Sequence, residues 1–175
     1  MFEKFLKHVN WEGENSFASE EAFREKLGGE SFLNGMYRLF RKDQLEKWTG
    51  IVEEAFPAHR GGIEVFGYDW FGQIYAVDKK TKMVVWFQPG TGDVLDIPAD
   101  FVSFHEEEIV ANPEEALVSR YFEYWFENSG RRILKHNECV GYKVPLYLNG
   151  VDDLENLEVS DMEVYWGIMS PLMNL

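Results

Sequence analysis

The sequence has a single cysteine, Cys139, and no apolar run long enough to cross a membrane. One cysteine cannot form an internal disulfide bond, so the core must stabilise the fold. No uninterrupted apolar stretch approaches the roughly 18 residues that a spanning helix needs. The start, MFEKFLKHVN, also lacks the apolar run of about 7–15 residues found in secretory signals. We therefore expect a cytoplasmic protein that does not associate with membranes.

Basic residues are scarce: 17 Lys and Arg face 31 Asp and Glu, which gives a formal net charge of -14. Such a charge repels phosphate backbones and argues against direct nucleic-acid binding. It suits a basic protein partner, although it would serve solubility alone equally well. The imbalance lies in the C-terminal two thirds, since residues 137–175 carry seven acidic side chains and one basic side chain, Lys143.

The chain is nevertheless rich in aromatic residues. Its 14 Phe, 6 Trp and 8 Tyr make up 16% of 175 residues, enough large side chains to fill one core. The length is typical of one domain, and we find no internal repeat, low-complexity stretch or Pro-rich linker that would mark a boundary. We expect a single domain over residues 1–175.

Helical spacing dominates the N-terminal third. Apolar residues recur at this spacing over residues 2–9, and a second helix is expected over 19–27, with Ser19 as N-cap and Gly28 as the stop. The segment GMYRLF alternates and predicts a strand over 35–40. A longer helix follows up to Pro57, with Asp43 in a capping-box spacing.

The period changes to two between residues 61 and 98. Four apolar runs are separated there by the turn-like groups DWFG, KKTK and PGTG, which predicts an antiparallel meander. Beyond it we expect helices over 100–110 and 113–126, the second with Asn112 as N-cap. The fold class predicted is α+β, with a central antiparallel meander sheet of about four to six strands packed by flanking helices.

The C-terminal segment is less regular. CVGYKVPLYL predicts a strand or loop, and Asn149-Gly150 predicts a turn. A last helix is expected to begin at Ser160, because Glu163 stands at the capping-box spacing from it.

The sequence offers no convincing catalytic or metal-binding constellation. His105-Glu106 begins a zincin-like pattern, but the second histidine is replaced by Ile109. We therefore expect His105 on a helix surface, kept protonated by neighbouring carboxylates. Cys139 lies three residues from His136, a superficial thiol and base, but its apolar neighbours favour a buried structural cysteine. No cofactor is implied, and a non-enzymatic binding protein is favoured.

Two groups of residues are candidates for partner binding. Trp70 and Phe71 stand at a strand turn, where they either serve as an exposed anchor or fold back on the core. The others are acidic side chains that would steer a basic partner, although most carboxylates in such a chain are expected to be solvated. The acidic candidates are Glu106, Glu107, Glu108, Asp152, Asp153, Glu155, Glu158, Asp161 and Glu163.

Three stretches carry a resemblance to a known family: GGIEVFGYDWFGQIYAVD, VVWFQPGTGDVLDIPADFVSFHEEEIV and NECVGYKVPLYLNGVDDLENLEVSDMEVYW. They resemble the C-terminal domain of type VI secretion DNase-immunity proteins, which a GAD-like domain often precedes, and are distantly similar to the SUKH immunity superfamily. The similarity runs from about Gly35 to Trp166. The most specific residues are Cys139, Val140, Gly141, Tyr142, Lys143, Pro145, Leu146, Asn156, Leu157, Glu158, Asp161, Tyr165 and Trp166.

The resemblance implies a SUKH-like fold in which residues 1–60 form a reduced GAD-like portion and residues 61–175 an immunity-type domain. It further implies a cytoplasmic immunity protein that occludes a cognate toxin, a cationic nuclease by the charge argument, without covalent chemistry. An intracellular regulatory or scaffold module of the same fold, with no toxin partner, is the alternative. Both a monomer and a homodimer agree with the sequence.

Overall fold

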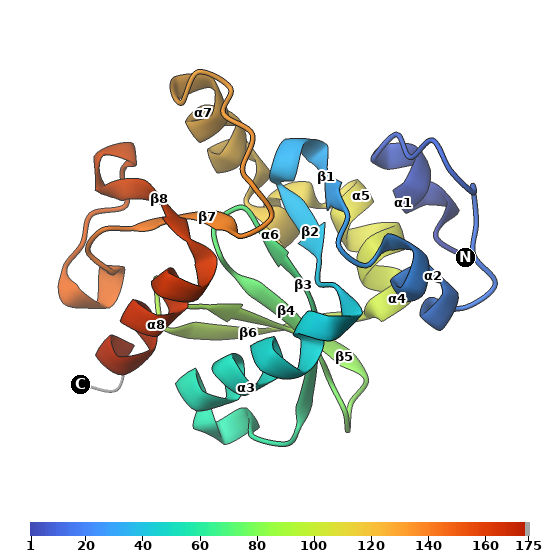
Figure 1. Ribbon diagram of the computed structural model, residues 1–175, viewed down its shortest axis with the longest axis horizontal. Coiled ribbons are helices and arrows are strands. Elements are labelled where there is room, and N and C mark those ends of the chain that lie inside the picture. The colour runs from blue at the N-terminus through green and yellow to red at the C-terminus, as the bar shows by residue number, and fades with distance from the viewer. Residues whose placement is uncertain (174–175) are drawn as a thin grey trace.

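Six antiparallel strands form one sheet whose spatial order follows the chain, as Figure 1 shows for the computed structural model, which describes residues 1–173. The strands are β1 (Ser31–Phe32), β2 (Tyr37–Leu39), β3 (Ile63–Asp69), β4 (Ile74–Asp78), β5 (Met83–Gln88) and β6 (Asp93–Asp100). The predicted α+β class and meander are confirmed. The sheet also includes β1 and β2 from the first 60 residues, and β1 had no signal in the sequence. The last two residues of the domain expected over 1–175 lie outside the described residues.

A β-bulge in β3 sends its side chains to both faces of the sheet. Ile63 and Val65 belong to the core on one face, Phe66 to the core on the other, and Tyr68 to the first again. The pairing with β4 shifts register between Val65 and Gly67. The extra residue of a bulge inverts the alternation that follows it, so Tyr68 lies on the same face as Ile63 and Val65. The strand has few polar positions because a core covers each of its faces.

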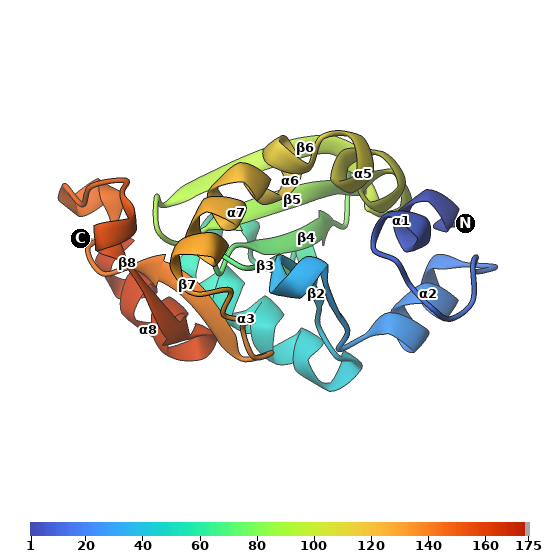
Figure 2. The same cartoon turned by 90° about the horizontal axis from the view of Figure 1, so that it is seen from above.

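Helices cover both faces of the sheet (Figures 1 and 2). Trp48 and Val52 of α3 and Trp166 of α8 pack in one core, whereas Phe23 of α2 and Phe122 of α7 pack in the other. The helical elements are α1 (Glu3–His8), α2 (Glu20–Leu27), α3 (Leu45–Ala55), α4 (Phe101–Ser103), a π-helical segment (Phe104–Glu108), α5 (Ile109–Ala111), α6 (Pro113–Leu117), α7 (Ser119–Asn128) and α8 (Met162–Met173). The flanking helices were therefore predicted correctly as a class.

The helix starts show which capping predictions were right. Ser19 caps α2 as predicted, since its Oγ accepts from the Ala22 N–H at 3.1 Å. Asp43 does not cap α3, which begins at Leu45 after a 3₁₀ turn over Lys42–Gln44. In that turn the Gln44 side chain accepts from the backbone N–H of Arg41 at 3.1 Å.

The two predicted helices after the meander are both interrupted. The segment expected over 100–110 begins as predicted, with the Asp100 carboxylate accepting from the Ser103 N–H, but contains five π-helical residues. The helix expected over 113–126 is broken at Val118, whose φ of 52° separates α6 from α7. Asn112 does not cap α6 through its side chain, which donates to Glu108 instead.

His105 is buried, and the prediction of a protonated surface histidine is wrong. Its side chain is fully inaccessible, with Nδ1 2.7 Å from Phe101 O and Nε2 2.9 Å from the Tyr37 hydroxyl. Phe2 and Phe5 from the start of the chain pack edge-on against the ring. Burial lowers the pKa of His105 to about 3, so the imidazole is neutral. The neighbouring carboxylates in sequence point elsewhere because the helix turns this residue towards the sheet.

Candidate functional site

A C-terminal hairpin and α8 are anchored on the turn between β3 and β4. The hairpin pairs β7 (Glu138–Tyr142) with β8 (Leu157–Asp161) in a separate two-stranded sheet. The Val140 N–H donates to Trp70 O at 2.8 Å, and Trp166 Nε1 of α8 donates to Gly72 O at 2.8 Å. These bonds place the hairpin at the end of the main sheet and fix the direction of the loop that joins its strands.

Two glycines allow close packing in this region. A Cβ on Gly141 would lie 2.4 Å from the Tyr165 ring, and one on Gly150 would lie 1.9 Å from Val144 O. Neither distance is sterically allowed for a side chain, and the obstacles are a buried ring and a backbone atom. The glycines therefore define the hairpin and its loop, in agreement with their place in the quoted motifs.

Buried Asn156 organises the loop over residues 143–156. Its Oδ1 accepts from the Val144 N–H at 3.0 Å, and its Nδ2 donates to Val144 O at 2.8 Å and Val151 O at 2.9 Å. One side chain thus satisfies three backbone groups and uses its acceptor and both amide hydrogens. The loop is held in one shape although it contains no regular secondary structure beyond short 3₁₀ turns.

The loop presents apolar and acidic side chains to solvent. Val144, Leu148 and Val151 are 45%, 42% and 62% exposed, respectively. We name the acidic loop surface for these three residues together with the exposed carboxylates that follow them, Asp152, Asp153, Glu155 and Glu158. Exposed apolar residues rimmed by charge are typical of protein-binding surfaces. These three aliphatic residues were not among the predicted binding residues, although their position among Pro, Asn and Gly was a signal of an exposed loop.

The structure divides the predicted C-terminal carboxylates into two groups. Asp161 caps α8 in place of the predicted Ser160, accepting from the N–H groups of Glu163 and Val164 and from Asn137 Nδ2. Burial opposes ionisation of Asp161, but these hydrogen bonds outweigh it and lower the pKa. Glu163 pairs with Lys47 of α3 at 2.5 Å. Asp161 and Glu163 therefore join α8 to its neighbours and do not belong to the acidic loop surface.

Within the surface, two carboxylates also support the loop. Asp152 accepts from the Tyr142 hydroxyl at 2.7 Å, and Asp153 accepts from the Glu155 N–H at 3.1 Å. The Glu155 and Glu158 side chains are exposed. Lys143 donates to Glu155 O at 2.7 Å, so the single basic residue of this segment is directed at the backbone.

The acidic run from Glu106 to Glu108 lies at the other end of the molecule. Figure 2 shows α5 beside α1 at one end and the C-terminal hairpin with α8 at the opposite end. Glu106 accepts from the Lys4 N–H at 3.5 Å, Glu108 accepts from Asn112, and only Glu107 is fully exposed. The structure does not bring these residues together with the acidic loop surface.

Trp70 and Phe71 are buried, so of the two alternatives for this turn the fold-back onto the core is confirmed and the exposed aromatic anchor is wrong. They are 0% and 6% exposed, and their rings stack 4.7 Å apart. Trp70 Nε1 donates to Leu117 O, while Phe71 packs against Tyr142 of the hairpin. The turn looks exposed in the sequence because the hairpin and α7, which cover it, lie about 50–70 residues later along the chain.

The thiol and imidazole at 139 and 136 do not form a nucleophile and base pair. Cys139 is fully buried, and burial raises the pKa of its thiol. His136 Nδ1 instead lies 2.8 Å from the Tyr68 hydroxyl. Within residues 1–173, no group of three or more His, Cys, Asp or Glu side chains is arranged to hold a metal ion. No helix among the same residues is both long and apolar enough to cross a membrane.

Comparison with solved structures confirms that this architecture exists elsewhere. A crystal structure of Atu4351 from Agrobacterium tumefaciens is similar with a TM-score of 0.64 at 16% identity, and the match covers 97% of this chain and 88% of that one. At this identity the likeness establishes a shared fold only. No curated protein sequence matches the chain.

The C-terminal part of the chain matches a known protein family. Residues 99–173 match the family described as T6SS immunity protein Tdi1, C-terminal. The segment contains the hairpin, Asn156, α8 and the whole acidic loop surface, whereas the main-sheet meander lies almost entirely before it. The resemblance to type VI secretion immunity proteins predicted from the sequence is confirmed over residues 99–173, which are less than half of the chain, and the match does not reach the part of the predicted similarity before residue 99.

Proposed function

We propose that the chain is an immunity protein that binds a cognate toxin of the nuclease type and blocks it by occlusion, without catalysis. The observation that supports this most is the family match over residues 99–173, which encloses the acidic loop surface. A protein that neutralises a DNA-cutting toxin has to meet it where the DNA is, so we place its action in the cytoplasm.

The chemistry of the surface supports a basic partner. Residues 137–175 contain seven acidic residues and one basic residue. Nucleases present basic surfaces to DNA, because binding depends on neutralising phosphates. An acidic surface facing such a site speeds association and competes with the nucleic acid, while Val144, Leu148 and Val151 supply apolar area at its centre.

Rescue of toxin-expressing cells tests the proposal. Cells expressing a type VI secretion nuclease toxin from the source organism should survive when this chain is co-expressed. Charge reversal at the surface, Glu155→Lys with Glu158→Lys, should abolish rescue, and a catalytically inactive toxin should then associate with it at least about tenfold more slowly. Val151→Asp should weaken binding mainly through faster dissociation.

The matched control reverses two exposed carboxylates elsewhere, Glu54→Lys with Glu107→Lys. It makes the same change in net charge and should preserve rescue. Equal loss of rescue by both double variants would refute the assignment of the surface. Failure of the unaltered chain to rescue against any nuclease toxin of the organism would instead favour a regulatory or scaffold module of the same fold.

A further inference from the structure

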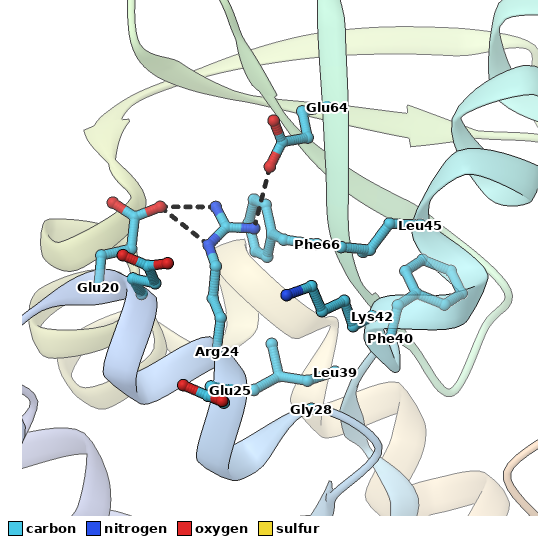
Figure 3. A pocket seen from close by; sticks show the side chains of 11 residues that line it. Glu20, Arg24, Glu25, Gly28, Leu39, Phe40, Lys42, Leu45, Glu64 and Phe66 are labelled. Carbon is cyan, nitrogen blue, oxygen red and sulfur yellow. Dashed lines mark hydrogen bonds and ion pairs between the residues drawn. The ribbon is translucent and has the colours of Figure 1, made fainter.

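A groove outside the family-matched segment lies between α2, the connection from β2 to α3, and β3. Its volume is about 430 Å³, within the usual range for binding sites. The floor is apolar and is formed by Leu39, Phe40, Leu45 and Phe66. Figure 3 shows these side chains beneath a rim of charged residues from α2 and β3.

Arg24 is fixed in the wall of the groove with its charge already balanced. Its guanidinium is 2.7 Å from Glu20 and 3.7 Å from Glu64, and lies 3.9 Å from the centre of the Phe101 ring. The two carboxylates pair with the guanidinium N–H groups, as the dashed lines in Figure 3 show, and the Phe101 ring lies against one guanidinium face. Arg24 therefore shapes the groove and leaves little charge for an anionic ligand.

The remaining rim charge is negative. Four carboxylates and two cations line the groove, and Glu21 and Glu25 on α2 are exposed and make no ion pair within the described residues. Lys42 extends into the opening from the other side and is likewise unpaired (Figure 3). Because the positive charge of Arg24 is already paired with carboxylates, the unpaired Glu21 and Glu25 make the groove favour a cationic ligand. The positive charge of Lys42 opposes the binding of such a ligand.

The depression continues along α3. A more open hollow shares Leu45 and Glu64 with the groove and is lined further on by Glu46, Gly50 and Glu53, with Lys79 as its one basic residue. Gly50 stands in the middle of α3, with no atom within 4 Å of the position that a Cβ would take. Alanine would fit there and would favour the helix, so the fold itself gains nothing from this glycine. A bare helix backbone permits close approach of another chain.

We propose that this groove binds an extended basic segment of a partner protein. Lysine or arginine stems would cover the apolar floor, their charges would meet Glu21 and Glu25, and the segment would continue past Gly50. Long basic side chains match an apolar floor with an acidic rim, because their stems are apolar and only their ends are charged. The groove lies outside residues 99–173, so the proposal stands independently of the toxin-binding function.

An NMR titration with an acetylated, amidated hexalysine peptide at low salt tests it. Amide shifts should concentrate at the residues lining the groove. Glu21→Gln with Glu25→Gln should weaken binding roughly tenfold, whereas the control Glu107→Gln with Glu123→Gln, which changes net charge equally at exposed sites elsewhere, should change it little. Equal weakening by both double variants, or shifts confined to the acidic loop surface, would overturn the proposal.

Two single variants test which charge the groove prefers and whether the bound segment runs along α3. Lys42→Gln should tighten hexalysine binding roughly threefold, because it removes a repelling charge from an exposed position. If Lys42→Gln bound hexalysine more weakly, the groove would be an anion site and the proposal would be overturned. Amide shifts at the lining residues on addition of a hexaglutamate peptide would lead to the same conclusion. Gly50→Ala should reduce hexalysine affinity while leaving the shifts near α2 in place. If Gly50→Ala bound hexalysine with unchanged affinity, the proposal that the segment runs along α3 would be refuted.

Discussion

Asp69 is a carboxyl group whose complete burial favours the protonated form, although the hydrogen bonds that it accepts favour the ionised form. Its Oδ1 accepts from the N–H groups of Phe71 and Gln73, and the Tyr75 hydroxyl lies 3.1 Å from its Oδ2. The same hydroxyl is 2.5 Å from Ala116 O and carries only one proton for two acceptors. The ionised Asp69 and Ala116 O therefore compete for the Tyr75 proton, whereas protonation of Asp69 would let it donate to Tyr75 and leave the Tyr75 proton for Ala116 O. Burial accordingly raises the pKa of Asp69 from 3.8 to about 7, against the effect of the hydrogen bonds to its charged form.

The raised pKa predicts a stability that falls as pH increases. The folded chain holds this proton more tightly than the unfolded chain, so the stabilisation is complete below about pH 3.8 and is lost as pH rises through about 7. A difference of about three pH units corresponds to about 4 kcal/mol of unfolding free energy. Asp69→Asn should abolish this dependence, since its amide keeps the acceptor for Phe71 and Gln73 and gains a donor to Tyr75.

Urea unfolding followed by tryptophan fluorescence between pH 4 and 8 measures the effect. The free energy of unfolding of Asp69→Asn minus that of the unaltered chain should rise by about 4 kcal/mol across this range, because all other titrating groups cancel in the difference. Asp96→Asn, at an exposed position on β6, should give a flat difference. A flat difference for Asp69→Asn as well would show that Asp69 is ionised throughout and would refute the reasoning.

Three further predictions concern single residues. Neutral His105 should contribute up to about 5 kcal/mol to the unfolding free energy of the protein, a contribution that is lost as pH falls from 6.5 towards 3, because burial lowers the pKa of His105 in the folded state to about 3. Urea unfolding of His105→Gln should show no such loss. Asn156→Ala should cost about 2–4 kcal/mol of unfolding free energy by leaving the backbone groups of Val144 and Val151 unpaired, whereas a cost below about 1 kcal/mol would mean that water replaces the amide. Cys139 should resist a thiol reagent in the native state and react only on unfolding; rapid native labelling would contradict its burial.

The local patterns of the chain were sufficient for most secondary structure. The four runs between residues 61 and 98 alternate and are separated by turn residues, so the meander follows from local chemistry. Ser19 capped its helix for the same reason, because a cap depends on neighbours within three residues. The breaks at Val118 and in the π-helical segment lacked such a signal, since neither depends on Gly or Pro.

Long-range packing explains what the sequence could not predict. Arg38 looks like an exposed position on a short strand, yet it is fully buried and donates to the carbonyls of Lys135, Glu138 and Asp69. His105 was misplaced for a related reason: its surroundings come from α1, β2 and β3, which nothing in FHEEEIV specifies. Apart from Phe101 O, which contacts His105 from four residues away, these partners lie about 30 to 100 positions from the two residues.

The acidic candidates show the limit of charge counting. The C-terminal excess of carboxylates was evident in the sequence, but it could not show that Asp161 caps a helix and Glu163 pairs with Lys47. Glu155 and Glu158 remain exposed and available to a partner. Separating these roles required the positions of the groups that donate to each carboxylate.

The residues that carry the family resemblance lie mostly inside the C-terminal unit. Gly141 packs under Tyr165, Asn156 holds the loop, and Trp166 donates to the main sheet. These residues are required for the structure of the C-terminal unit, whether or not they contact a partner. The side chains of Leu148 and Val151, in contrast, face solvent. Asp152 and Asp153 are exposed but also accept hydrogen bonds that support the loop. We therefore expect substitutions at Leu148 and Val151 to change the surface that the loop presents to a partner while the loop keeps its shape.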